Sequence, residues 1–267
     1  MTETSQIGAP PLAAATPQML RQALHKGWRD FTRAPALSLA FAGVYVLLGW
    51  LMAGITWATG QSYWLVFAAV GFPLIGPFAA IGFYEISRRL QAGAALEAGA
   101  VMSVIFRQRN RQLPSLCAVI VILFLFWFFL AHMIFALFLG RATMTHVSTS
   151  FEVYRSLEGL TMLAVGTGVG AGFALLIFNI TVISLPMLLD REIDFVSAMI
   201  ASFQAVTRAP LVLLAWAGLI AVLTFLAMLP GFLGLFVVLP LLGHATWHLY
   251  DQMKTTAPEL RGEPARA

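Results

Sequence analysis

Two histidines stand one helical turn apart near the end of the chain, in the stretch LPLLGHATWHLY. A helix would place His244 and His248 on one face, because residues four apart lie above one another. Imidazoles at this spacing can hold a transition metal or take part in haem ligation. The other interpretation is structural, because ionisable groups inside membranes often bind a neighbouring helix or the interface.

Two acidic residues are candidates to complete such a site. Glu85 and Asp190 stand at the ends of two other apolar runs, where they would reach the same rim if the helices pack as a ring. Together with His244 and His248 they form the predicted metal site, and haem or a transition metal is the cofactor it would take. Because the structural interpretation of the histidines is favoured, the residues predict no resident cofactor.

Two further polar groups and four glycines lie inside apolar runs. His132 and Asn179 either line a solute path or form a bond between helices, and the second role is the commoner one. The stretch GTGVGAG has no preceding strand and no Lys-Ser/Thr pair, so it predicts no nucleotide site. Its glycines instead have the small-xxx-small spacing that lets another helix approach; they are Gly166, Gly168, Gly170 and Gly172.

The composition assigns the chain to the membrane. Of 267 residues, 60% are hydrophobic and only 10% are charged, whereas a soluble domain has about a quarter of its residues charged. We expect an all-α polytopic protein, since a helix of roughly 20 apolar residues crosses the hydrocarbon layer. Six runs reach spanning length: 37–59, 63–86, 114–140, 160–189, 208–229 and 231–250. A single cysteine, Cys117, excludes an internal disulfide and a multi-cysteine metal cage.

The basic residues predict the orientation. Fourteen of the 16 Lys and Arg residues fall on one side of the six runs, and only Arg141 and Arg155 fall on the other. Basic loops stay in the cytoplasm, so we expect both termini there, in the bacterial inner membrane. The positive charge thus faces the anionic headgroups of the bilayer and indicates no nucleic-acid partner.

The tetrapeptide Thr-Arg-Ala-Pro occurs twice, each time before an apolar run. Arg33 and Pro35 belong to the first copy, and Arg208 and Pro210 to the second. Proline cannot continue a helix, so each copy predicts a corner from a helix lying on the membrane to one crossing it. The expected apolar faces of the two lying helices are Leu20, Leu24, Trp28 and Phe31, and Phe195, Met199, Phe203 and Val206.

These features combine into a domain plan. We expect a disordered cytoplasmic tail over 1–15, an interfacial amphipathic helix and corner over 16–36, a six-helix transmembrane domain over 37–250 and a cytoplasmic tail over 251–267. We expect the six transmembrane helices to form three hairpins, each introduced by an interfacial helix and a corner, as a parallel internal repeat; the first and last hairpins carry the repeat, and the middle one is a weaker copy whose place in it stays open. The two lying helices have Thr16 and Asp194 as their expected N-caps.

Four segments carry a family resemblance: GPFAAIGFYEISRRL, SLPMLLDREIDF, SFQAVTRAP and LPLLGHATWHLY. From about Trp28 to Tyr250 the chain resembles a bacterial family of integral membrane proteins with a domain of unknown function, number 2189. The resemblance implies a bacterial inner-membrane protein and no established activity, substrate or catalytic residue. Some members of that family carry a label linking them to cytochrome c oxidase, which implies an association with a respiratory complex.

Three functions follow as hypotheses. The first is a non-catalytic accessory or scaffold protein that assists another membrane complex, because the apolar runs lack mid-membrane charge and contain helix-packing motifs. The alternative is a small-solute transporter or channel, whose path would follow proline-kinked helices. The third is a redox protein that binds a metal or haem through His244 and His248. No catalytic residue is predicted.

Overall fold

The computed structural model describes residues 8–60, 65–139 and 156–257. These residues form α-helices joined by short turns, without a strand among them, which confirms the all-α prediction. The helices are α1 Pro17–Arg33, α2 Pro35–Thr59, α3 Leu65–Gln91, α4 Ala98–Gln108, α5 Leu113–Leu139, α6 Leu157–Thr181, α7 Ser184–Asp190, α8 Phe195–Arg208, α9 Pro210–Met228 and α10 Leu235–Thr256.

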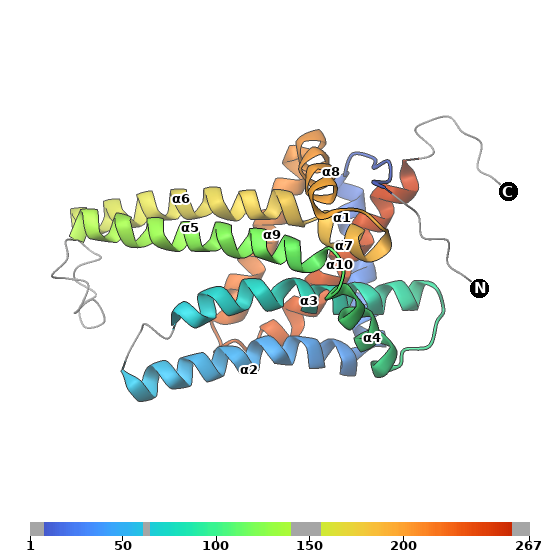
Figure 1. The fold of residues 1–267 in the computed structure, drawn as a ribbon, viewed down its shortest axis with the longest axis horizontal. Helices are drawn as coiled ribbons and strands as arrows, with labels where there is room; N and C mark the ends of the chain where they lie inside the picture. The colour runs from blue at the N-terminus through green and yellow to red at the C-terminus, as the bar shows by residue number, and fades with distance from the viewer. Residues whose placement is uncertain (1–7, 61–64, 140–155, 258–267) are drawn as a thin grey trace.

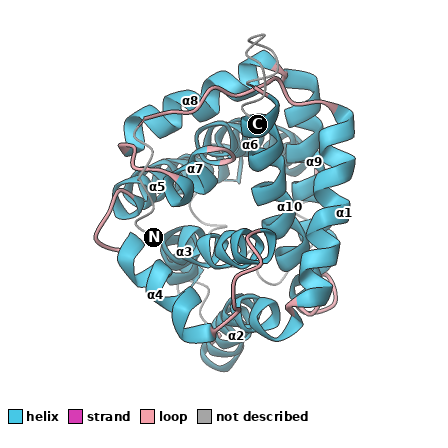
Figure 2. Cartoon of the chain, turned by 90° about the vertical axis from the view of Figure 1, so that its right-hand side faces the viewer, coloured by secondary structure: helices cyan, strands magenta, loops and turns pink. Residues whose placement is uncertain are grey.

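The long helices pair as consecutive hairpins. α2 packs on α3, α5 on α6 and α9 on α10, and the α5–α6 hairpin extends along the long axis of the molecule (Figure 1). The shorter helices α1, α4, α7 and α8 gather at one end, together with the last turns of α10, and we call this the polar end. Figure 2 looks onto the polar end and shows α1, α4 and α8 around its edge.

Four stretches among the described residues are long and apolar enough to cross a membrane. They are Pro35–Thr59, Leu113–Leu139, Leu157–Asp190 and Pro210–Met228. Such helices are apolar on all sides and expose large side chains, including Phe126 and Phe129 of α5, which suits a lipid environment. The count of six spans adds α3 and α10 and stays a prediction.

The two Thr-Arg-Ala-Pro segments have the same local structure. α1 ends at Arg33 and α2 begins at Pro35, with φ −128° and ψ 52° at the intervening Ala34. α8 ends at Arg208 and α9 begins at Pro210, with φ −137° and ψ 59° at Ala209. Proline suits the first position of a helix, because its fixed φ is helical and its missing N–H would have had no partner. The parallel repeat of whole hairpins, which the sequence predicts, stays a prediction.

Helices α1 and α8 begin where their caps were expected. The hydroxyl of Thr16 accepts a hydrogen bond from the Met19 amide at 3.3 Å, and Pro17 opens α1. The carboxylate of Asp194 accepts one from the Ser197 amide at 2.8 Å, at the start of α8. Each cap satisfies a backbone amide that the first turn of a helix leaves without a partner.

The face that α1 buries differs from the apolar face. Met19, Ala23, Gly27 and Asp30 are buried, in a helix that packs mainly on α10. Of the expected apolar face, Leu20 and Leu24 pack at the edge of the core, whereas Trp28 is 48% exposed. Small residues allow the two helix backbones to approach closely, so they take the inner face and leave the tryptophan for the surroundings.

The same division holds for α8. It buries Ala198, Ser202, Ala205 and Val206, while Val196, Ile200 and Phe203 are exposed. Of the four residues expected to share its apolar face, only Val206 is buried. Exposed apolar side chains on α1 and α8 suit the interfacial position expected for these helices, which stays a prediction.

The expected terminal tails begin and end at different residues in the structure. Residues 8–15 were expected to be disordered, but Ala13 and Ala15 are buried and the Ala13 amide donates to the Met253 carbonyl at 2.9 Å. Two successive prolines favour an extended chain, which suits this pairing. At the other end, α10 continues to Thr256, beyond the expected boundary at 250, because Met253 belongs to its buried face. Residues 1–7 and 258–267 lie outside the described residues.

Candidate functional site

The buried face of α10 holds both predicted histidines. His244 and His248 are fully buried and lie one turn apart, as their spacing predicted. Buried residues follow one another from His244 to Tyr250, because α10 has α1, α2, α3, α7 and α9 around it. A helix enclosed on so many sides buries polar side chains only where neighbours can bind them.

His244 joins α10 to the hairpin α2–α3. Its Nε2 lies 3.0 Å from the hydroxyl of Ser38, and its Nδ1 lies 2.9 Å from the hydroxyl of Ser87 and 3.1 Å from the carbonyl of Phe83. A carbonyl only accepts, so the proton is assigned to Nδ1 and the Ser38 hydroxyl donates to Nε2. Both ring nitrogens are therefore bound within the chain.

His248 joins α10 to α1. Its Nε2 lies 2.6 Å from Oδ2 of Asp30, whose side chain is almost completely buried. The side-chain amide of Gln91 lies 3.4 Å from Nδ1 of the same ring, so Nδ1 accepts and Nε2 donates to the carboxylate. A buried carboxylate needs such donors, because burial without them costs several kcal/mol, on the order of 3–5 when one partner is removed.

The charge state of Asp30 reflects these contacts. Burial alone would raise the pKa of the Asp30 carboxyl, but the hydrogen bond from His248, the electrostatic effect of His248 and a hydrogen bond from Ser87 outweigh it. The pKa of Asp30 therefore lies below its usual value. Because donors stabilise the charged form, Asp30 is an ionised group inside the polar end.

These contacts form one connected set, which we call the buried polar chain. Ser87 links its halves, since its hydroxyl is bonded both to His244 and to Asp30. Its buried members are Ser38, His244, Ser87, Asp30 and His248, and the exposed Gln91 closes the set at the surface; together they come from α1, α2, α3 and α10. A fully satisfied buried network fixes one arrangement of the helices that carry it.

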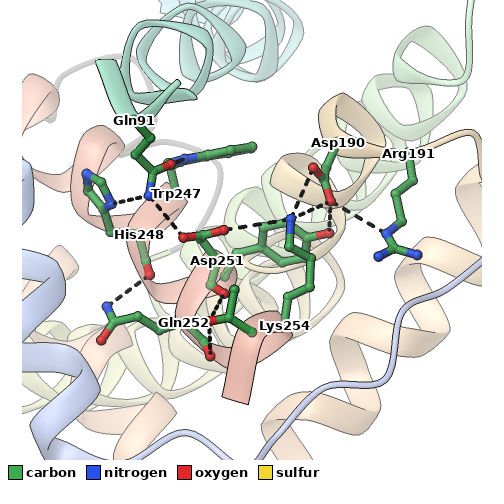
Figure 3. A network of polar contacts seen from close by, with 10 residues as sticks. Gln91, Asp190, Arg191, Trp247, His248, Asp251, Gln252 and Lys254 are labelled. Atoms are coloured by element: carbon green, nitrogen blue, oxygen red, sulfur yellow. Dashed lines mark hydrogen bonds and ion pairs between the residues drawn. The ribbon is translucent and has the colours of Figure 1, made fainter. Parts of the chain in front are cut away.

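A second set of contacts continues along α10 to α7, and Figure 3 shows it from close by. Gln91 donates to Asp251 at 2.9 Å, and the Lys254 ammonium lies 3.7 Å from that carboxylate. Lys254 also lies 3.1 Å from Asp190 of α7, which accepts a hydrogen bond from the Tyr250 hydroxyl at 2.7 Å. The polar side of α10 thus connects α3 with α7.

The predicted metal site needs Glu85 and Asp190 beside the histidines. Glu85 is fully buried, and its oxygens lie 2.8 Å from Arg88 and 2.7 Å from Arg89 on its own helix. Asp190 is bound by Tyr250 and Lys254. Within the described parts of the chain, no three His, Cys, Asp or Glu side chains gather in a way that could hold a metal. The metal hypothesis stays a prediction that rests on the histidine pair alone.

The two polar groups at membrane depth have different surroundings. His132 is exposed, and its Nδ1 donates to the Phe128 carbonyl of its own helix at 2.8 Å. Asn179 uses its backbone carbonyl, which accepts from the Ser202 hydroxyl of α8 at 2.7 Å. The side-chain oxygen of Asn179 is buried and has no hydrogen-bond partner among the residues that the structure describes.

One of the four predicted packing glycines has a close neighbour. A Cβ added at Gly170 would lie 3.0 Å from Nε1 of Trp127 on α5, whereas Gly166, Gly168 and Gly172 face open space. A close approach of two helix backbones lies elsewhere, at Gly27 of α1: a Cβ there would lie 2.8 Å from the Ala245 amide nitrogen and 2.9 Å from the Leu241 carbonyl oxygen of α10.

Most partners of the two histidines were not predicted from the sequence. Asp30, Ser38, Ser87 and Gln91 were not among its candidates, although all four bind a histidine ring. A signal was present in α1, where Asp30 continues the small-residue face of Ala23 and Gly27. An acidic residue on the face that allows a close helix approach indicates a buried partner.

The long apolar helices and the polar end that joins them define an integral membrane protein. Residues 65–190, from the start of α3 to the end of α7, match the family described as "Predicted integral membrane protein (DUF2189)". The match confirms the resemblance to this family over that segment. Neither a curated protein nor a solved structure matches the chain significantly.

Proposed function

We propose that this integral membrane protein is a non-catalytic accessory or scaffold protein that assists another membrane complex in a bacterial inner membrane. The observation that carries the proposal is the binding of both buried histidines, at both ring nitrogens, by groups of the same chain. Imidazoles used in this way stabilise a helix arrangement and leave no open position for a ligand. Respiratory complexes are the first partners to test, given the resemblance.

The spanning helices support a role without coupled transport. α2, α5 and α9 contain no Asp, Glu, Lys or Arg, and the Leu157–Asp190 stretch has its two acids at its ends. Coupled transporters usually hold ionisable residues at mid-membrane, where they bind the ion or the proton. The ionisable groups that are buried here lie at the polar end and are paired there.

The α5–α6 hairpin is the surface on which we expect a transmembrane helix of the partner protein to pack. Only 11% of the spanning window of α5 is buried inside the chain. On α6, Gly168 and Gly172 lie one turn apart and face open space. Glycines at this spacing allow a neighbouring helix backbone to approach closely, which is the main source of helix association in lipid.

A photoreactive amino acid at Leu175 tests this contact in native membranes. Leu175 is exposed on α6, three residues beyond Gly172, and Val222 is a matched exposed position on α9. We expect a stoichiometric protein adduct from position 175 and none from position 222. Gly172→Leu should remove the adduct, whereas Gly218→Leu on α9, where Gly218 also faces open space, should leave it intact. No adduct and no co-purifying protein would contradict the proposal.

The same purified protein tests the metal or haem hypothesis. If the histidines are structural, metal analysis and haem absorbance should find less than one equivalent of either per chain. One equivalent that disappears with His248→Gln would instead favour the redox hypothesis.

A transporter is the second candidate, and the orphaned side-chain oxygen of Asn179 favours it. A buried carbonyl oxygen without a donor costs about 1–3 kcal/mol, and a polar solute could satisfy it. Solute flux into proteoliposomes that Asn179→Leu abolishes would support this role, and flux unchanged by Asn179→Leu would count against it.

A further inference from the structure

A polar cavity lies at the polar end, between the turn that joins α4 to α5 and the linker that joins α7 to α8. Its volume is about 360 Å³, which falls within the range of small-molecule sites. Two arginines and two carboxylates line it: Arg111, Arg191, Glu192 and Asp194. The cavity is separate from the buried polar chain and shares no residue with it.

The charges of the cavity are balanced and only partly satisfied. Arg111 lies 2.5 Å from Glu192 in an ion pair that is open to solvent on both sides. Arg191 has a buried Nε without a hydrogen-bond partner in the described structure, although Asp190 lies 3.5 Å away. The exposed amides of Asn110 and Gln112 add further donors. A polyanion would meet two carboxylates here, whereas a zwitterion could bind both signs of charge.

Exposed apolar side chains flank the cavity, which suits a position at the level of the lipid headgroups. Phe106 is 60% exposed and lies in the last turn of α4, which leads into the arginine-bearing turn. Val196 and Ile200 on α8 are also exposed, just beyond the other wall of the cavity. Amphipathic helices insert such side chains at the boundary of headgroups and acyl chains, which leaves their polar neighbours among the headgroups.

We propose that this cavity binds the phosphoethanolamine group of a membrane lipid. The phosphate lies at Arg111 and Arg191, since guanidinium groups bind phosphate oxygens in pairs. The primary ammonium lies at Glu192 and Asp194, as a donor to their carboxylates. The headgroup inserts between Arg111 and Glu192. The exposed ion pair between these two side chains is then replaced by two, one from Arg111 to the phosphate and one from the ammonium to Glu192. A choline headgroup has no N–H to donate, and a glycerol headgroup has no positive charge.

Lipid binding to the purified full-length chain tests the site. In nanodiscs or by native mass spectrometry, phosphatidylethanolamine should bind about tenfold more tightly than phosphatidylcholine or phosphatidylglycerol. Glu192→Gln should remove the preference for phosphatidylethanolamine over phosphatidylcholine. Arg111→Gln should weaken the binding of both of these lipids about tenfold. Arg107→Gln is the matched control, because Arg107 is exposed near the same turn and does not line the cavity.

The exposure of Arg111 and Glu192 keeps the test independent of folding, and unchanged unfolding midpoints verify this for each variant. Soluble phosphoethanolamine separates a lipid from a free ligand with the same chemistry. It should compete only weakly, since it lacks the acyl chains that the flanking apolar residues contact. If soluble phosphoethanolamine competed as strongly as phosphatidylethanolamine itself binds, the proposal that the ligand is a membrane lipid would be overturned. Equal binding of the three lipids, or binding unchanged in both variants, would overturn the site.

Discussion

The imidazole Nε2 of His248 lies 2.6 Å from Oδ2 of Asp30 and joins residues 218 positions apart in the chain. Both side chains are buried, so the contact fixes α1 against α10 inside the polar end. The rest of the buried polar chain then extends the link to α2 and α3. The histidine pair thus acts first as a connection between helices.

Removal of the Asp30 carboxylate should destabilise the fold. Asp30→Ala leaves His248 buried without an acceptor, and we expect a loss of about 3 kcal/mol in the free energy of unfolding. Asp30→Asn keeps an acceptor for the neutral ring and should cost about 1 kcal/mol. Reversible unfolding in detergent micelles measures both. Glu97→Gln is the control, since Glu97 is exposed and its side chain makes no cap bond; an equal loss there would contradict the account.

The close approach of α1 and α10 should tolerate no Cβ at position 27. In Gly27→Ala the new carbon would lie 2.8 Å from a backbone nitrogen of α10, so the helices must separate. We expect about 1–3 kcal/mol of destabilisation, as for overpacked cores. Gly99→Ala on α4 meets nothing within 4 Å and should be neutral or stabilising by up to about 1 kcal/mol. The midpoint of thermal unfolding should therefore fall in Gly27→Ala and stay unchanged or rise in Gly99→Ala.

The lowered pKa of Asp30 predicts an acid-sensitive link. A carboxyl whose pKa is lower in the folded chain stabilises the fold at pH values above its pKa in the unfolded chain, which is about 3.9. This stabilisation is lost as the pH falls through the pKa of the folded chain. The groups near this carboxylate are His248, His244, Ser87 and Arg29, the last at 4.0 Å. The stability difference between wild type and Asp30→Asn should be constant from pH 5 to 7 and shrink below about pH 4. A constant difference down to pH 2 would show that the pKa of Asp30 is the same in the folded and the unfolded chain, which would contradict the account.

Tyr250 should hold α7 in place. Its hydroxyl donates to Asp190 at 2.7 Å and also accepts from the side chain of Arg191, and Tyr250→Phe removes both bonds. We expect about 1 kcal/mol of destabilisation, with faster hydrogen exchange in the backbone of α7 than in α5. Thr255→Val is a control on the same helix, since the Thr255 hydroxyl is exposed and donates to its own helix. Exchange that accelerates equally throughout the chain would mean that the bond supports the whole fold.

Local chemistry explains what the sequence predicted. Proline fixes the start of α2 at Pro35 and of α9 at Pro210, and side-chain oxygens of Thr16 and Asp194 fix two other starts. Each signal acts within a few residues, so it can be identified without a fold. The long apolar runs were identified for the same reason.

The inner faces could not be predicted in this way. In lipid an apolar side chain gains no hydrophobic free energy when it moves from the acyl chains into a contact between helices. Hydrophobicity therefore does not distinguish lipid-facing residues from residues at helix contacts. Trp28 therefore stays exposed while Gly27 and Ala23 face α10. Contacts such as Asp30 with His248 depend on which backbones approach closely, and no local pattern encodes a partner so distant in the chain.

A double-mutant cycle on Asp30 and His248 tests the central claim, that the histidines bind the helices of the polar end together. Unfolding free energies of Asp30→Ala, His248→Ala and the double variant give the coupling between the two side chains. We predict a coupling of at least about 1 kcal/mol, so that the double variant is more stable than the sum of the single losses implies. Additive losses, within about 0.3 kcal/mol, would contradict the account.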